Sequence, residues 1–237
     1  MIKRFAGLTG WILSGSLAAL VVAGLAYAEN PFSAAFPDPE RFAEDIAAFE
    51  AADAANPAPQ DATLCIGSSS MRMWHPNLAR DLAPLTVIPR GFGGSTMYDV
   101  LHYAPRIVLP GRPRTILLYE GDNDIDFGVT PAAFMATFQA FVALVARELP
   151  ATRIFVISIK PSGLRWAKWP AMREANDLLR AACETNPSLT YIDVAPHLLG
   201  EDGLPDDGLF LEDRLHLNEE GYAVWSRVVA GVLVAKR

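Results

Sequence analysis

Short apolar runs alternate with amphipathic segments of helical periodicity along most of this 237-residue chain. The short runs have the length of buried strands, whereas the longer segments repeat their apolar residues at spacings of three and four. Strands that alternate with helices form a parallel sheet with helices on both faces. The runs lie at Leu64–Gly67, Leu85–Ile88, Thr115–Tyr119, Arg153–Ile159 and Leu189–Val194, and the helical segments at Pro131–Glu148, Pro170–Glu184 and Glu219–Ala235. We therefore expect an α/β fold, a three-layer α/β/α sandwich around a five-stranded parallel sheet.

Loops rich in glycine, hydroxyl and amide groups follow the first three runs. They are Gly67-Ser68-Ser69-Ser70, Gly93-Gly94-Ser95 and Gly121-Asp122-Asn123-Asp124. The carboxyl ends of parallel strands meet at one edge of a sheet, and such sheets bind their ligands there. Farther along, Asp213 and His216 are three residues apart, so both side chains can lie on one side of a turn. A hydroxyl, a base, an orienting carboxylate and hydrogen-bond donors for an oxyanion are the groups that acyl transfer through a covalent intermediate requires.

In this order, the blocks resemble those of the SGNH hydrolases, also called GDSL-type esterases and lipases. The resemblance runs from about Thr63 to the carboxyl terminus, and it is closest to small lysophospholipase- and acetylhydrolase-like members. It implies a flavodoxin-like SGNH hydrolase fold and a serine esterase activity that needs no cofactor and no metal. Two positions depart from the family pattern: Ser68 stands where an aspartate is usual, and Pro89 where many relatives have asparagine.

The resemblance also implies roles for individual residues. Ser69 is the expected nucleophile, His216 the base and Asp213 the carboxylate that orients it. The expected oxyanion hole consists of the backbone N–H groups of Ser69 and Gly94 and the side-chain amide of Asn123.

The loop from Pro161 to Trp169 leaves the sheet on the side of this site and carries two tryptophans and two cations. Trp166 and Arg165 are candidates for substrate contact, because indole rings stack on sugars and alkyl chains alike. Simple packing at the start of the next helix is the alternative for Trp166. The resemblance implies a short acyl ester or a lysophospholipid as substrate.

Two other functions are compatible with the same residues. The site could transfer an acyl group to or from envelope sugars, as an O-acyltransferase or deacetylase. Alternatively, the chain could be a catalytically silent module that binds glycans or lipids. Silent relatives usually lose the nucleophile or the base, whereas this chain has both Ser69 and His216.

The first 28 residues have the pattern of an export segment. Lys3 and Arg4 precede a charge-free run from Phe5 to Ala28 that ends in small residues. The run is also long enough to cross a bilayer, for which about 20 residues suffice. We expect a protein of the cell envelope or periplasm, either cleaved after about Ala28 or anchored in the membrane through residues 5–28.

Residues 29–62 are expected to form a helix and a linker that pack on the hydrolase domain at 63–237. Asp38 can cap this helix, and Pro39 suits its first position. The chain contains no further domain in this interpretation, and its oligomeric state is left open.

The charge and the spacing of potential ligands exclude two kinds of partner. A formal net charge of −7 argues against nucleic acid, because nonspecific binding depends on lysine and arginine. Asp122, Asp124 and Asp126 match the first three positions of a calcium loop, but Phe127 and Ala133 replace its glycine and glutamate. The other histidines, His75, His102 and His197, share no metal-ligand spacing with His216, so they are expected to be surface or packed residues.

Overall fold

The computed structural model describes residues 36–59 and 61–235. Within them, five parallel strands form one sheet in the order β2-β1-β3-β4-β5, which confirms the predicted α/β fold. The strands are β1 (Thr63–Gly67), β2 (Val87–Gly91), β3 (Thr115–Tyr119), β4 (Arg153–Ile157) and β5 (Leu189–Ile192). The export segment predicted at residues 1–28 lies outside the described residues and stays a prediction.

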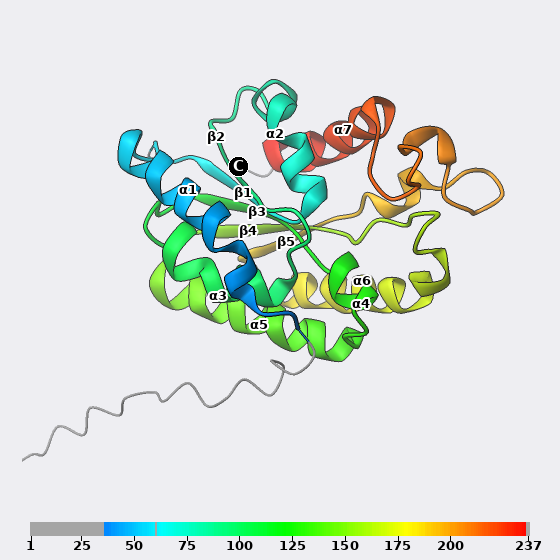
Figure 1. The fold of residues 1–237 in the computed structure, drawn as a ribbon, viewed down its shortest axis with the longest axis horizontal. Helices are drawn as coiled ribbons and strands as arrows, with labels where there is room; N and C mark the ends of the chain where they lie inside the picture. The colour runs from blue at the N-terminus through cyan, green and yellow to red at the C-terminus, as the bar shows by residue number, and fades with distance from the viewer. Residues whose placement is uncertain (1–35, 60, 236–237) are drawn as a thin grey trace, which may run out of the picture. The chain divides into compact units, whose positions relative to one another are not determined.

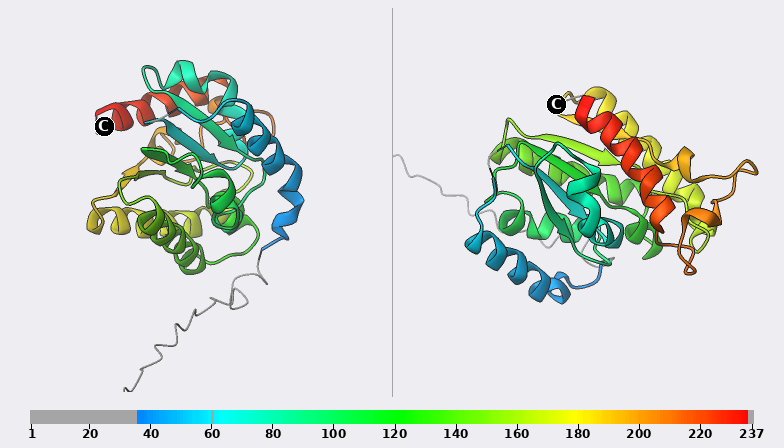
Figure 2. Two further views of the ribbon diagram at one scale, coloured as in Figure 1. Left: turned by 90° about the vertical axis from the view of Figure 1, so that its left-hand side faces the viewer. Right: turned by 90° about the horizontal axis from the view of Figure 1, so that it is seen from above.

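Helices cover both faces of the sheet (Figures 1 and 2). On one face lie α3 (Met97–Ile107), α5 (Pro131–Glu148) and α6 (Trp169–Thr185), and on the other α2 (Ser69–Asp81) and α7 (Glu219–Ala235). Side chains point alternately to the two faces along each strand. Leu64 and Ile66 of β1 therefore pack in the hydrophobic core on the side of α3, α5 and α6, whereas Cys65 packs in the core on the side of α2 and α7. Burial on both faces explains why the strands read as almost continuous apolar runs.

The segment before β1 packs against α3. Asp38 accepts a hydrogen bond from the Glu40 N–H at 3.0 Å and begins a 3-10 turn, Pro39–Phe42, which continues as α1 (Ala43–Ala55). The predicted cap and helix are therefore present, with a tighter first turn than expected. Ile46 is fully buried, and the Phe42 ring lies edge-on to Phe92 at 5.0 Å.

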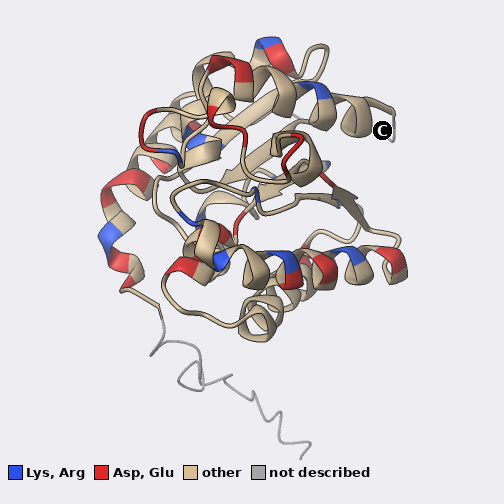
Figure 3. Cartoon of the chain, turned by 90° about the vertical axis from the view of Figure 1, so that its right-hand side faces the viewer, with Lys and Arg blue, Asp and Glu red and all other residues tan. Residues whose placement is uncertain are grey.

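Charged residues lie mainly on the helices and loops around the sheet (Figure 3). Across residues 36–59 and 61–235, no helix combines the length and the hydropathy needed to span a membrane. Nor does any group of three or more histidine, cysteine or acidic residues in this part of the chain have the arrangement of a metal site.

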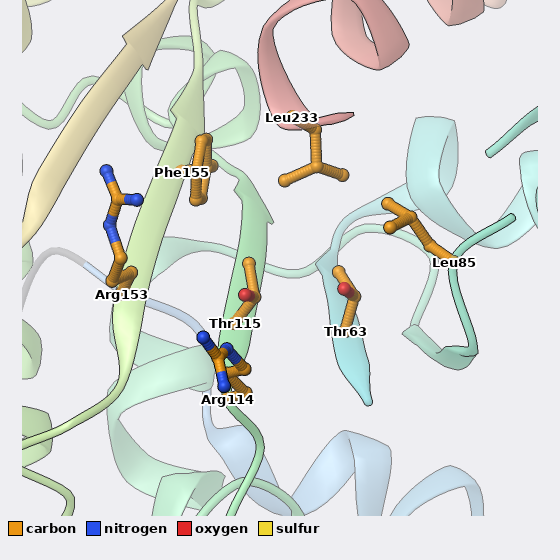
Figure 4. A pocket seen from close by; sticks show the side chains of 7 residues that line it. All are labelled: Thr63, Leu85, Arg114, Thr115, Arg153, Phe155 and Leu233. Carbon is orange, nitrogen blue, oxygen red and sulfur yellow. The ribbon is translucent and has the colours of Figure 1, made fainter. Parts of the chain in front are cut away.

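A cavity of about 260 Å³ lies at the amino-terminal edge of the sheet (Figure 4). Its lining includes Thr63, Thr115 and Arg153, the first residues of β1, β3 and β4. Ligands of open parallel sheets bind at the opposite, carboxyl edge. This cavity is therefore remote from the loops that the sequence singles out.

Buried carboxyl groups fasten the loops at the carboxyl edge. Thr96 and Asp99 form a capping box that begins α3, and both are fully buried. The next helix, α4 (Asp122–Asp126), contributes Asp124, whose two carboxyl oxygens lie 3.0 and 3.2 Å from the backbone nitrogen of Met97. Burial raises the pKa of Asp124 to about 8, so this side chain is largely neutral below that pH.

Gly67 has no room for a side chain. A Cβ atom there would lie 2.1 Å from the Tyr119 carbonyl oxygen, and φ is +150°. Gly67→Ala is therefore expected to destabilise the fold by about 3 kcal/mol or more, since backbone rather than a flexible side chain must move. Chemical denaturation measures the loss. Gly231→Ala in α7 is the control: no atom lies within 4 Å of its Cβ position, so a gain of about 0.5–1 kcal/mol is expected. Equal stability of the two variants would contradict the close contact.

Asp124→Asn should reduce the pH dependence of stability. The unfolded chain releases the Asp124 proton near its ordinary pKa of 3.8, whereas the folded protein keeps it to about pH 8. Folding therefore becomes less favourable as the pH rises through this window, by up to about 1.4 kcal/mol per pH unit. Asparagine still offers an oxygen to Met97 and does not titrate, so the unfolding free energy of the variant should fall less between pH 5 and pH 8. Asp45→Asn, at an exposed position of α1, should leave the wild-type profile unchanged, and an unchanged profile in Asp124→Asn would refute the assignment.

Candidate active site

Ser69 is the first residue of α2, directly beyond the carboxyl end of β1. Its hydroxyl oxygen lies 2.9 Å from Nε2 of His216. The hydroxyls of Ser68 and Ser70 are buried and have no hydrogen-bond partner among the described residues. Of the three consecutive serines, Ser69 is thus the one that contacts the imidazole.

Asp213 and His216 lie on one turn, as their spacing predicts. Nδ1 of His216 is 2.6 Å from Oδ2 of Asp213, and Oδ1 of Asp213 accepts the N–H groups of Leu215 and His216 at 2.9 Å each. Partial burial acts to raise the pKa of Asp213, but the hydrogen bonds from His216 and Leu215 outweigh it and lower the pKa to about 2. The carboxylate is therefore ionised throughout the neutral range, and it fixes which ring nitrogen faces Ser69.

Backbone contacts hold this turn in place. Arg214 has a left-handed φ of +56°, and its carbonyl accepts the Leu164 N–H at 3.1 Å. Asn218 donates its side-chain amide to the carbonyls of Gly208 and Phe210 and accepts the Gly221 N–H. Asn218 belongs to the same sequence block as His216, but its anchoring role depends on contacts with Gly208 and Phe210 and was not predicted.

The three expected oxyanion donors come from the loops after β1, β2 and β3. The N–H of Ser69 belongs to the first turn of α2, whose N-cap residue Ser68 makes no side-chain capping bond. Gly94 has a φ of +87°, which glycine adopts without strain. The Asn123 amide donates one hydrogen bond to the Ser95 carbonyl at 2.8 Å. An amide has two protons, so its second proton is available to a ligand.

A buried ion pair lies next to Asn123. Lys160 and Asp122, both almost inaccessible to solvent, approach to 2.8 Å, and the Tyr119 hydroxyl donates to the same carboxylate oxygen at 3.2 Å. Burial acts to raise the pKa of Asp122, but Lys160 and Arg165 lower it below its ordinary value. Lys160 is not among the predicted site residues. It could have been noticed, because a lysine that directly follows a buried apolar run is rare unless it is paired with an acid.

The two candidates for substrate contact differ in their surroundings. The Arg165 guanidinium is mostly buried and pairs with Asp122 at 3.5 Å and Asp126 at 3.1 Å, so it fastens its loop to α4. Trp166 stacks on Trp169 at a centroid distance of 6.1 Å and lines a cleft of about 740 Å³. The rest of that lining comes from Gly163, from the segment 200–207 and from Arg214; Arg165 is not part of it.

The other histidines have different environments. Nε2 of His75 accepts the Gly91 N–H at 2.9 Å, and burial together with Arg90 and Arg72 lowers its pKa to about 4. His75 is thus a neutral, packed residue that ties α2 to the end of β2. His102 is partly exposed and lies 4.0 Å from Glu40, and His197 is exposed.

Known proteins place the chain in a family. Residues 58–224 match the model of the GDSL-like lipase/acylhydrolase family. The chain is 28% identical over 178 residues to the human platelet-activating factor acetylhydrolase IB subunit alpha1, which covers 71% of this chain and 74% of that protein. The bovine protein is equally similar, with 73% of its length covered.

Solved structures share the fold. A GDSL-like lipase from Bacteroides thetaiotaomicron superposes with a TM-score of 0.70 at 15% identity, covering 84% of this chain and 98% of that one. An acetylxylan esterase from Geobacillus stearothermophilus gives a TM-score of 0.59 at 14% identity, covering 71% and 91%.

The family model spans well over half of the chain and includes Ser69, Gly94, Asn123, Asp213 and His216. The protein therefore belongs to the GDSL-like lipase/acylhydrolase family of hydrolases that act on ester bonds.

Proposed function

We propose that the protein is a serine esterase that removes short acyl groups through a Ser69–His216–Asp213 triad. The observation that carries the proposal is the continuous pair of contacts, 2.9 Å from Ser69 to His216 and 2.6 Å from His216 to Asp213. Both distances lie within the range in which a base can take a proton from a nucleophile and be oriented by a third group.

In this mechanism, His216 takes the hydroxyl proton of Ser69 while Oγ attacks the ester carbonyl carbon. The oxyanion that develops accepts hydrogen bonds from the N–H groups of Ser69 and Gly94 and from the Asn123 amide. When the tetrahedral intermediate collapses, the alcohol departs with a proton from His216. The acyl group stays bound to Ser69 as an acyl-serine. Water, deprotonated by His216, then hydrolyses this acyl-enzyme and restores the serine.

The names of two related proteins support a short acyl group. The human relative is named as an acetylhydrolase and the Geobacillus structure as an acetylxylan esterase, so both act on acetyl groups by name. The cleft beside Trp166 borders the Asp213–His216 turn through Arg214 and has room for the alcohol portion of the ester. Ester hydrolysis is favoured over a silent glycan- or lipid-binding module because the nucleophile, base and orienting carboxylate are in contact.

Lysophospholipids and envelope sugars are the other acyl carriers to be tested. Transfer of the acyl group to a sugar hydroxyl would use the same triad, with the sugar in place of water. Product analysis with acetylated sugars, lysophospholipids and p-nitrophenyl esters of increasing chain length separates these activities. Substrate binding without turnover of any ester would instead support the binding module.

Ser69→Ala is expected to abolish hydrolysis of p-nitrophenyl acetate, because no other hydroxyl of the described residues contacts His216. Loss of a triad member costs up to about 10⁶-fold in kcat. Ser68→Ala and Ser70→Ala are the matched controls; each removes a buried hydroxyl without a partner among the described residues, so activity and stability should change little. An inactive Ser68→Ala beside an active Ser69→Ala would show that the nucleophile is misassigned.

Asp213→Asn should lower kcat by up to about 10⁴-fold without unfolding the protein, since asparagine favours the wrong imidazole tautomer. Because the pKa of Asp213 is about 2, protonation of Asp213 should cause no loss of wild-type activity as the pH falls toward 4. Steady-state rates against pH and circular dichroism check both points. Asp193→Asn breaks an ion pair of equal length, 2.6 Å to Arg180, and should retain activity. Near wild-type turnover in a folded Asp213→Asn would rule out the triad.

A further inference from the structure

Ser95 joins the two loops that carry the proposed oxyanion donors. Its carbonyl oxygen accepts the Asn123 side-chain amide at 2.8 Å, and its hydroxyl donates to Oε1 of Glu120 at 2.5 Å. Ser95 is fully buried and directly follows Gly94. Ser95 is thus covalently linked to Gly94, the residue of one donor, and hydrogen-bonded to the side chain of the other, Asn123.

Glu120 is an unusual residue at this place. It is 1% exposed and follows the last residue of β3, and Ser95 is its only hydrogen-bond partner among the described side chains. Burial, reinforced by the carboxyl groups of Asp124, Asp122 and Asp99, raises the pKa of Glu120 well above its ordinary value. Burial therefore favours the protonated form of this side chain, and its Oε1 is the acceptor for Ser95.

Gly94 depends on this anchor. Apart from its two chain neighbours, no described residue has an atom within 4 Å of the position that a Gly94 Cβ would take, so no packed side chain restrains it there. Glycine also has more backbone freedom than any other residue. The bond from Ser95 to Glu120 anchors the residue that directly follows Gly94, and so limits the movement of the Gly94 backbone.

We propose that Glu120 and Ser95 are positioning residues that hold the Gly94 N–H and the Asn123 amide at a fixed separation for the oxyanion. The proposal rests on the proposed esterase function. Neither residue touches the substrate. Their contribution is to limit the movement of donors that are effective only in the correct geometry.

Steady-state kinetics with p-nitrophenyl acetate test this role. Ser95→Ala and Glu120→Ala should lower kcat by about 10- to 100-fold and leave KM nearly unchanged, because misplaced oxyanion donors weaken the transition state rather than the bound ester. Glu120→Gln resembles the neutral acid in shape and keeps the acceptor for Ser95, so it should restore most of kcat. This rescue distinguishes positioning from a need for negative charge.

Ser158→Ala is the matched control. Ser158 is also fully buried, and its hydroxyl accepts the N–H groups of Val194 and Ala195 at 3.0 and 3.2 Å. The variant should lose stability but retain kcat per folded molecule. If Ser95→Ala behaves in the same way, Ser95 is merely structural and the proposal is overturned.

A second measurement does not require activity. The Asn123 side-chain amide, assigned in ¹H–¹⁵N spectra by its absence in Asn123→Ala, should shift and exchange faster in Ser95→Ala and Glu120→Ala. It should be unaffected in Ser158→Ala. Unchanged amide signals would overturn the positioning role even if the enzyme is active. Shifted signals in a protein that hydrolyses no ester would instead contradict the esterase function while supporting the link from Glu120 to Asn123.

Discussion

The position of the three loops of the candidate site depends on the close contact between Gly67 of β1 and Tyr119 of β3, which leaves no room for a side chain at Gly67. The Gly67 carbonyl accepts the Phe92 N–H at 2.9 Å, where the loop after β2 begins. The next residue, Ser68, donates its N–H to the Tyr119 carbonyl at 3.3 Å, where the loop after β3 begins. Because Gly67 has no side chain, β1 can lie this close to β3, and the proposed nucleophile Ser69 leaves the sheet between the loops that carry the other two proposed oxyanion donors.

Electrostatics around the site depend on which buried acids are charged. Asp122 is paired with Lys160 and stays ionised, whereas burial favours the neutral forms of Glu120 and Asp124. Four fully ionised carboxylates, including Asp99, would repel an oxyanion formed nearby. Neutral acids instead act as hydrogen-bonding groups, and Arg41 pairs with Asp99 at 2.6 Å. The site is thus surrounded by polar groups without a matching accumulation of negative charge.

The sequence predicts most of the fold because the strands and the longer helices have strong periodicity. The bounds of β3, α5 and α7 agree with the prediction. The sequence analysis predicts no bounds for α2 and α3. Each of these helices contains an internal proline, Pro76 in α2 and Pro105 in α3, and an internal proline normally argues against a helix. The predicted β2 begins too early: Leu85 is buried in the core but precedes the strand, since burial alone does not separate a strand from a packed loop.

For the site, sequence spacing identifies groups that act together within one turn or one loop, as with Asp213 and His216. It does not identify partners that meet only in the folded chain. Ser95 and Glu120 are 25 residues apart, and Lys160 and Asp122 are 38 apart. Glu120 could have been noticed as an acid that directly extends an apolar strand, but its partner could not. Arg165 illustrates the converse case, because its position in a promising loop did not reveal its ion pairs with Asp122 and Asp126.

The missing side-chain cap of α2 has a thermodynamic consequence. Thr96 and Thr130 cap α3 and α5 with their hydroxyls, but Ser68 leaves the first turn of α2 without such a bond. A capping side chain typically contributes about 1 kcal/mol, and the free protein forgoes it at the helix that bears Ser69. An anion that accepted hydrogen bonds from the N–H groups of this turn would take the place of the cap. Helix stability and ligand affinity would then be linked, so that occupancy of the proposed site and order in the first turn of α2 would rise together.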